Sequence, residues 1–274
     1  MSRAAFELVF NLTTQQPWLK VKQSSLSNLI DCCGNAEEQY LICDLLRRFT
    51  YLDNSTFSDA LRLIADHIEK GWCLSPENTL ISARENSKFS DSSQLVAYNL
   101  KAGGQLHGAW TTNRFLSRLR DIENSEVEHV ILVDEFIGTG ETMQKSVEYL
   151  RKKSVEWSQK FKIFVAVVAG MEFGLKRVCD VADSVYAVHS LRKGISDHYS
   201  ELDREQRILN MIRLEETLAN MSNRGKLATH SLGYKKSEAL YARHEGNTPN
   251  NVFPIFWWES DRDGNDREPI LKCR

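Results

Sequence analysis

The sequence predicts an α/β protein with a three-layer, mainly parallel sheet. Short runs of apolar and β-branched residues, each the length of a buried strand, alternate between residues 79 and 188 with segments of helical periodicity. Glycines and short polar stretches separate the strands from the helices, as in other sheets built from alternating strands and helices. Such sheets bind ligands at the carboxyl ends of their strands, so functional side chains are expected there.

Composition bounds the class of protein. A chain of 274 residues can bury a substantial core, as one large domain or as a core domain with additions. The net charge of −2 provides no global attraction to nucleic acid or to a membrane. No apolar run approaches the roughly 20 residues of a membrane span. The six cysteines lack paired metal-ligand spacing and no secretory leader is visible, so we expect a reduced, soluble, cytoplasmic protein.

Residues 1–75 are predicted to be a helical N-terminal addition. Apolar residues recur at helical spacing from Leu41 to Phe49 and again from Phe57 to Ile68. Between these stripes, Asn54 to Thr56 provides a helix-capping signal. The region carries no recognisable chemistry, and we interpret it as a helical cap or as a surface for a protein partner.

The predicted α/β core spans residues 76–200 and begins with a strand from Thr79 to Ala83. A polar, hydroxyl-rich loop follows, and then a helix that Gly103 and Gly104 close. A strand, a polar loop and a capped helix start form a candidate anion site, although a solvated loop explains the pattern equally well.

The next segment is predicted to contain a second strand, from Gln105 to Trp110. A helix ending near Glu123 should follow and carry three arginines, which are Arg114, Arg118 and Arg120. An arginine-bearing helix face is usually solvated, and the alternative that it faces an anionic ligand stays open.

The central motif runs from Val130 to Thr142 and reads Val-Ile-Leu-Val-Asp-Glu-Phe-Ile-Gly-Thr-Gly-Glu-Thr. Its four apolar residues predict a buried strand, which we expect to end at the acidic pair Asp134 and Glu135. Gly138 and Gly140 then allow a tight turn whose backbone can approach a ligand, and a helix starts near Thr142.

This order of residues suits a phosphorylated sugar. Backbone N–H groups and the helix dipole at a helix start favour a phosphate. Two carboxylates beside them suit sugar hydroxyls or a hydrated Mg²⁺. An ordinary strand-to-helix connection is the alternative, because such connections also favour Asp, Gly and Thr. A P-loop is a poor match because no lysine follows Gly140, and a dinucleotide fingerprint lacks its third glycine.

The motif resembles the phosphoribosyl pyrophosphate (PRPP) motif of type I phosphoribosyltransferases. The resemblance implies that the carboxylates of Asp134 and Glu135 hold the ribose hydroxyls in the catalytic site. It implies that the loop and helix start cradle the 5′-phosphate, through Gly138, Thr139, Gly140, Glu141 and Thr142. By position, the loop from Ser82 to Lys88 would receive the pyrophosphate, with Arg84 and Lys88 as counter-charges.

This sequence departs from the family pattern at three positions of the motif. Glu135 stands where Asp is usual, Phe136 is bulky, and Gly138 replaces a hydroxyl residue. We expect an open surface loop, so that Gly140→Val would block PRPP binding without harming the fold. Removing both charges, by Asp134→Asn with Glu135→Gln, should leave stability unchanged or slightly higher because the two carboxylates repel each other.

The second half of the core is predicted from three further segments. A strand should span Phe161 to Ala169, a helix Phe173 to Cys179, and another strand Asp183 to Val188. The polar stretch from His189 to His198 should be a loop placed to line the pocket or a surface turn, and a long helix should span Asp203 to Met221.

Residues 201–258 are predicted to form a helix followed by an aromatic segment, and residues 259–274 a charged, mobile tail. Phe256, Trp257 and Trp258 are first of all core or interface residues, and we expect at least one of the tryptophans to be largely buried. In the resembled family, a variable hood covers the core and stacks on the base. The segment is therefore a candidate C-terminal hood in a strand or edge position.

Together these observations predict a type I phosphoribosyltransferase-like protein that binds PRPP or a nucleotide, with Mg²⁺ carried by PRPP and no metal ligand of its own. It would transfer the phosphoribosyl group to a base or cleave a nucleotide. One alternative is a non-catalytic module that senses PRPP or a nucleotide. Another is an effector subunit of a bacterial antiphage complex of the retron type, since the chain also resembles phosphoribosyltransferase-like proteins of such loci. In that case, the N-terminal helices and the aromatic segment would contact protein partners.

Overall fold

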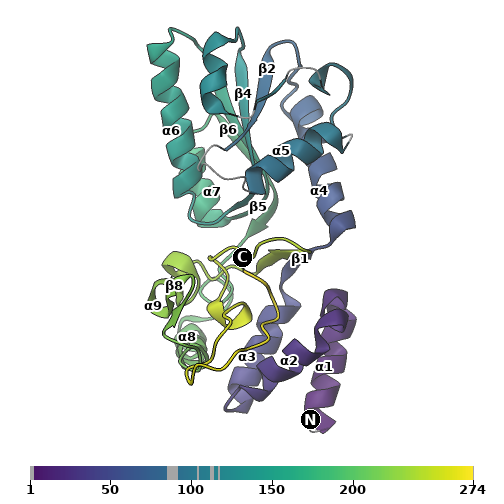
Figure 1. Cartoon of the computed structure of the whole chain (residues 1–274), viewed down its shortest axis with the longest axis vertical. Helices are drawn as coiled ribbons and strands as arrows, with labels where there is room; N and C mark the ends of the chain where they lie inside the picture. The colour runs from purple at the N-terminus through teal and green to yellow at the C-terminus, as the bar shows by residue number, and fades with distance from the viewer. Residues whose placement is uncertain (1–2, 85–91, 104, 112–113, 117, 274) are drawn as a thin grey trace. The chain divides into compact units, whose positions relative to one another are not determined.

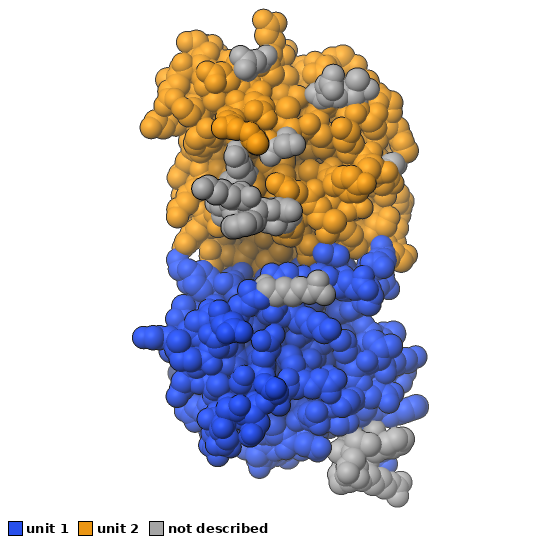
Figure 2. Space-filling model, viewed as in Figure 1, with its two compact units in different colours: residues 1–54, 192–274 blue, residues 55–191 orange. Residues whose placement is uncertain are grey.

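The computed structural model describes residues 3–84, 92–103, 105–111, 114–116 and 118–273. The chain forms two compact units, which Figure 2 colours separately. Unit 1 comprises Met1–Asn54 and Arg192–Arg274, and unit 2 comprises Ser55–Leu191. The predicted boundaries at 75/76 and 200/201 differ from these. The segment after residue 54 belongs to the unit that contains the sheet because it packs on a strand of that sheet. The His67 ring, for example, is stacked on the Tyr186 ring with centroids 3.8 Å apart.

Unit 2 is built on a five-stranded sheet in which every neighbouring pair is parallel. The strands lie in the order β3-β2-β4-β5-β6. Their bounds are Phe115–Leu116 for β3, Thr79–Ala83 for β2, His129–Ile137 for β4, Lys162–Met171 for β5 and Ser184–Leu191 for β6. The predicted parallel sheet is confirmed, and four of its strands lie where apolar runs predict them.

Helices cover both faces of this sheet (Figure 1). Because side chains alternate along a strand, Val130 and Leu132 of β4 face helices α6 (Glu141–Glu156) and α7 (Glu172–Cys179) in one apolar cluster. Helix α5 (Ser92–Ala102) packs on β4 and β2. Helix α4 (Asn54–Asp66) continues as a π-helical turn, His67–Gly71, after which Trp72 packs on Phe164 of β5 at 4.9 Å. This arrangement confirms the three-layer prediction.

The segment between α5 and β4 differs from the prediction. Gln105–Trp110 is not a strand, because the Leu106 N–H turns back to the Leu100 carbonyl at the end of α5, and Gly108–Thr111 is a 3₁₀ turn. Gly108 has φ +59°, a left-handed conformation that ends an extended path. The arginine-bearing segment is not an α-helix either. It contains the edge strand β3 and a 3₁₀ turn, Leu119–Asn124.

Unit 1 joins the two ends of the chain. Its helices are α1 (Arg3–Gln15), α2 (Gln23–Asp31), α3 (Ala36–Arg47), α8 (Glu201–Glu215) and the short α9 (Leu227–His230). Strand β1 (Thr50–Leu52) pairs in parallel with β9 (Tyr241–Arg243), and β7 (Met221–Ser222) pairs with β8 (Gly225–Lys226). Three 3₁₀ turns complete the described elements: Pro17–Lys22, Tyr234–Lys236 and Pro254–Phe256. None of the described helices combines the length and the apolarity that crossing a membrane would require.

The aromatic segment forms the core of unit 1. Trp257 and Trp258 are only 1% and 0% exposed, which confirms the prediction that at least one is buried. The segment is an irregular chain around the turn Pro254–Phe256 and not a strand, because proline lacks the N–H that a ladder needs. The Trp257 indole N–H instead donates to the Val252 carbonyl at 2.9 Å.

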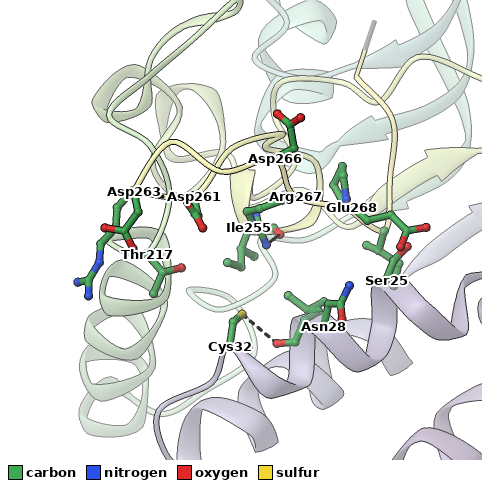
Figure 3. Close-up of a pocket in the computed structure, with 14 residues that line it drawn as sticks. Ser25, Asn28, Cys32, Thr217, Ile255, Asp261, Asp263, Asp266, Arg267 and Glu268 are labelled. Atoms are coloured by element: carbon green, nitrogen blue, oxygen red, sulfur yellow. Dashed lines mark hydrogen bonds between the residues drawn. The ribbon is translucent and has the colours of Figure 1, made fainter.

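The C-terminal residues pack on this core, so the prediction of a mobile tail is wrong. Ile270 and Leu271 are buried, and the Arg267 guanidinium donates to the Trp258 carbonyl at 2.9 Å. The tail also forms one wall of a cavity of about 430 Å³, opposite residues of α2 such as Asn28 (Figure 3). The two apolar residues near the end anchor the charged stretch that precedes them.

A buried carboxylate in unit 1 should make its stability depend on pH. Glu215 accepts hydrogen bonds from the Ser231 hydroxyl (2.6 Å) and the Leu232 N–H (3.0 Å), yet burial dominates and raises its pKa from 4.5 to about 7. Because the folded pKa exceeds the unfolded one, folding loses stability as pH rises from about 4.5 to above 7. The loss amounts to about 3 kcal/mol.

We expect Glu215→Gln to remove this pH dependence. Relative to the parent, its free energy of unfolding in urea should rise by up to about 3 kcal/mol between pH 5 and pH 8. The neighbouring exposed residue provides the control, since Glu216→Gln should shift nothing between the two pH values. Parallel pH profiles for Glu215→Gln and the parent would contradict the assignment.

Candidate functional site at the carboxyl ends of β2 and β4

The acidic pair lies inside β4 and not after it. The pairing of β4 with β5 continues to the register Ile137↔Gly170, so the strand is longer than its apolar run predicts. Asp134 and Glu135 are only 2% and 3% exposed, so both carboxylates are buried. Buried carboxylates need partners that replace water, and the neighbouring strand provides one.

Asp134 is held by groups from three segments. Its Oδ2 lies 3.0 Å from Nε of Arg84, which follows β2 and forms an ion pair with it. Its Oδ1 accepts hydrogen bonds from the Glu135 N–H (2.8 Å) and from the Ser92 hydroxyl at the start of α5 (3.3 Å). The ion pair arises because β2 and β4 are parallel neighbours, paired up to Ala83↔Val133, so that their ends meet. The sequence indicated Arg84 as a counter-charge for a ligand, and its pairing with Asp134 was missed.

Of the three residues predicted for the pyrophosphate, the structure describes Ser82 and Arg84, and these two have different surroundings. Ser82 is fully buried in β2, with its hydroxyl within donating distance of the carbonyls of Ala83 (3.0 Å) and Leu116 (3.4 Å). Its side chain therefore belongs to the core and not to a loop. Lys88 lies outside the described residues. Of the two described residues, Arg84 is the one that lies beside the acidic pair.

The predicted phosphate loop is a tight turn packed on α7. Gly140 has φ +77° and is the cap residue of α6, where glycine offers no side-chain acceptor to the first N–H groups. A Cβ on Gly140 would lie 2.4 Å from the Gly174 carbonyl oxygen, and one on Gly174 would lie 2.1 Å from that of Gly138. The expectation of an open loop is therefore wrong, and Gly140→Val would damage the turn itself. Gly174 was missed because its role depends on this backbone contact.

The remaining loop residues lie around the first turn of α6. Thr139 and Thr142 are partly exposed, and Ser146 donates to the Thr142 carbonyl inside the helix. The Glu141 carboxylate pairs with the Arg177 guanidinium of α7 at 3.0 Å. This pairing draws the only carboxylate of the predicted loop toward α7 and offsets its repulsion of a phosphate.

The polar stretch His189–His198 divides between the two units. Its first residues belong to β6, and the turn from Arg192 onward belongs to unit 1. There Asp197 accepts from the Lys193 N–H at 2.8 Å, and its carbonyl accepts from Arg192. This turn is closed by its own contacts, and we assign it no ligand.

A parallel three-layer sheet with an acidic pair and a glycine turn at one carboxyl edge defines a phosphoribosyltransferase-like protein. Within that class, the chain belongs to the PRTase-CE family, whose model matches residues 33–272. A comparison with curated proteins found no match.

Several solved structures show a weak likeness to the chain. Orotate phosphoribosyltransferase from Aeropyrum pernix is 17% identical, with 50% of this chain and 72% of that one covered at a TM-score of 0.34. The xanthine-guanine-hypoxanthine phosphoribosyltransferase of Helicobacter pylori is 12% identical (50% and 86% covered, TM-score 0.34). The HGPRT-ase of Leishmania tarentolae in complex with GMP is 16% identical (57% and 93% covered, TM-score 0.33). Likenesses this weak carry no argument about substrate.

Proposed function

We propose that the chain binds PRPP, or a nucleotide with the same phosphorylated ribose, at the carboxyl end of β4. One observation carries the proposal: an acidic pair and a glycine turn that starts a helix lie within the short stretch Asp134–Gly140 at this edge of the sheet. The carboxylates of Asp134 and Glu135 would accept hydrogen bonds from the ribose hydroxyls. The N–H groups at the start of α6, together with the hydroxyls of Thr139 and Thr142, would hold the 5′-phosphate.

Arg84 gives this site a way to respond to its ligand. In the structure its guanidinium neutralises Asp134. A pyrophosphate group beside the ribose would offer Arg84 a second anionic partner, with more charge and more acceptor oxygens than one carboxylate. We expect Arg84 to move from Asp134 to the ligand, which would release the Asp134 oxygens for the ribose.

Mg²⁺ would enter with PRPP. Carboxylate oxygens are ligands that Mg²⁺ accepts, so the acidic pair is compatible with a hydrated ion, and the described residues contain no cluster of three or more side chains that could hold a metal alone. When bound, the ion would neutralise charge that develops on the leaving pyrophosphate. The residues themselves would position the ribose and the phosphate.

The reaction of the proposed site is transfer of the phosphoribosyl group to a base, or cleavage of a nucleotide. A second candidate is a module that senses PRPP or a nucleotide without turnover, in which a ligand-dependent change of the Arg84–Asp134 ion pair would serve as the signal. Titration calorimetry with Mg²⁺–PRPP followed by a pyrophosphate-release assay separates the two. Binding without release, across a panel of bases, would support the sensor.

Asp134→Asn with Glu135→Gln should weaken Mg²⁺–PRPP binding at least about tenfold, which requires only about 1.4 kcal/mol. Charge-assisted hydrogen bonds to ribose hydroxyls are worth roughly this much or more. The ion pair reverses the expectation about stability. Arg84 loses the opposite charge of Asp134, so the free energy of unfolding should fall by about 1–3 kcal/mol.

Two exposed acids of unit 2 provide the matched control. Asp121→Asn with Glu123→Gln changes the net charge equally and should leave both binding and stability as in the parent. If the double variant of the acidic pair stays folded and binds PRPP with full affinity, the ribose is held elsewhere. If the control loses affinity equally, binding reflects overall charge only.

A further inference from the structure

Unit 1 contains a cavity that the proposed function does not use. Its volume is about 470 Å³, which is in the range of small-molecule sites (roughly 300–1,000 Å³). It lies where β9 ends and where the C-terminal residues pass the turn that precedes α2. Four stretches that are distant in the sequence therefore build its wall, and three of them contribute one cation each.

These cations are Lys22, Arg243 and Lys272. Lys22 ends the 3₁₀ turn Pro17–Lys22, and Arg243 ends β9. The Lys272 carbonyl accepts both the N–H (3.0 Å) and the hydroxyl (2.7 Å) of Thr248, which holds the tail against the wall. The docking of the tail thus completes a three-cation cluster.

Within the described residues, neither Lys22 nor Lys272 has a carboxylate at ion-pair distance. Among the described residues that line the cavity, Glu245 has the one carboxylate; its side chain is 79% exposed and lies 3.9 Å from His244 Nε2. Like charges that line one cavity repel one another, and an anion bound there relieves that repulsion.

Part of the remaining wall is apolar or aromatic, beside the polar residues His244, Glu245 and Thr248. Val21, Ile270 and Leu271 line the cavity together with Tyr51, whose ring is stacked on Trp18 at 4.4 Å. The Tyr51 hydroxyl is 3.0 Å from Nδ1 of His244. Burial, with the carboxylates of Asp53 and Glu245 nearby, raises the pKa of Tyr51 and keeps this hydroxyl protonated. A ligand that fills the cavity therefore needs an apolar body as well as an anionic head.

We propose that this cavity is a binding site for a small organic phosphate. Lys22, Lys272 and Arg243 hold the phosphate, and the apolar wall with the stacked Tyr51 holds the organic part. A dianionic phosphate matches three cations better than a carboxylate does, because it carries more charge and three acceptor oxygens. The site lies in the unit that does not contain Asp134, and it does not depend on the function proposed for that residue.

The test uses the full chain and titration calorimetry with phenyl phosphate, which has no ribose for the acidic pair. Lys22→Gln with Lys272→Gln is expected to weaken phenyl phosphate binding at least about tenfold, because two charge-assisted contacts are lost. Arg243 is left intact because its guanidinium also donates to the His244 carbonyl at 3.2 Å. The matched control is Lys20→Gln with Lys226→Gln, which removes two exposed lysines of the same unit that do not line the cavity. The control should bind like the parent.

Further arms identify what is recognised. Inorganic phosphate should bind more weakly than phenyl phosphate, and phenol should not bind detectably. Asp134→Asn with Glu135→Gln should leave phenyl phosphate binding unchanged. The proposal is overturned if the parent does not bind phenyl phosphate, if the control variant weakens binding as much as Lys22→Gln with Lys272→Gln, or if phenol binds equally well. Equal affinity for inorganic phosphate would also overturn it, because the apolar wall would then have no role.

Discussion

Replacing Trp257 with alanine is expected to lower the free energy of unfolding by about 3–5 kcal/mol, the usual cost of removing a large buried aromatic side chain. Trp257 is 1% exposed and packs against Trp258, with ring centroids 5.3 Å apart, and against His230 at 5.5 Å. Its indole N–H also satisfies the Val252 carbonyl, which would lose its partner in the variant. Urea unfolding followed by circular dichroism measures the effect.

An exposed residue of the same unit provides the comparison. Leu202 is 83% exposed on α8, so Leu202→Ala should change stability by less than about 0.5 kcal/mol. Trp257→Ala could instead unfold like the parent and lose affinity for Mg²⁺–PRPP. In that case the aromatic segment contributes to ligand binding, and the packing role assigned to Trp257 is wrong. Loss of stability with retained affinity, measured well below the unfolding midpoint, supports the packing role.

The second large effect is expected from Gly174→Ala. The new Cβ would lie 2.1 Å from the Gly138 carbonyl oxygen and 3.1 Å from the Gly140 nitrogen, so the backbone of the turn must move. Forced overpacking of this kind costs about 1–3 kcal/mol. The displaced turn begins α6, and we therefore expect Mg²⁺–PRPP binding to fall by more than tenfold.

The two readouts separate structure from ligand binding. Stability tests the contact between α7 and the turn, and calorimetry with Mg²⁺–PRPP tests whether that turn binds the phosphate. Gly34→Ala is the control, since its Cβ would make one ordinary contact at 3.4 Å, with Glu38 Oε2, and should leave both readouts unchanged. A destabilised Gly174→Ala protein that binds PRPP with full affinity would show that the turn is structural only.

Much of unit 2 could be predicted from local pattern. Four strands coincide with apolar runs bounded by turn residues, near residues 79–83, 130–133, 161–169 and 183–188. Such runs can be recognised in a single sequence because the pattern is local and does not depend on distant neighbours. The turn at Gly140 and the helix after it are local for the same reason. The two-residue strand Phe115–Leu116 has no periodicity to detect, and Gln105–Trp110 resembles a strand although it wraps the end of a helix.

The residues of the candidate site were readable from the sequence, but their state was decided by tertiary contacts. The unbroken apolar run ends at Val133, yet β4 continues because β5 pairs with it and because Arg84, which follows β2, neutralises Asp134. The charges of the C-terminal stretch predict a mobile tail, whereas Ile270 and Leu271 bury themselves in unit 1 and bring Lys272 to Lys22 and Arg243. A single sequence records the order of charges and apolar groups. The sequence does not record which distant charges form ion pairs or which short apolar segments become buried. Both depend on contacts that form only when the chain folds.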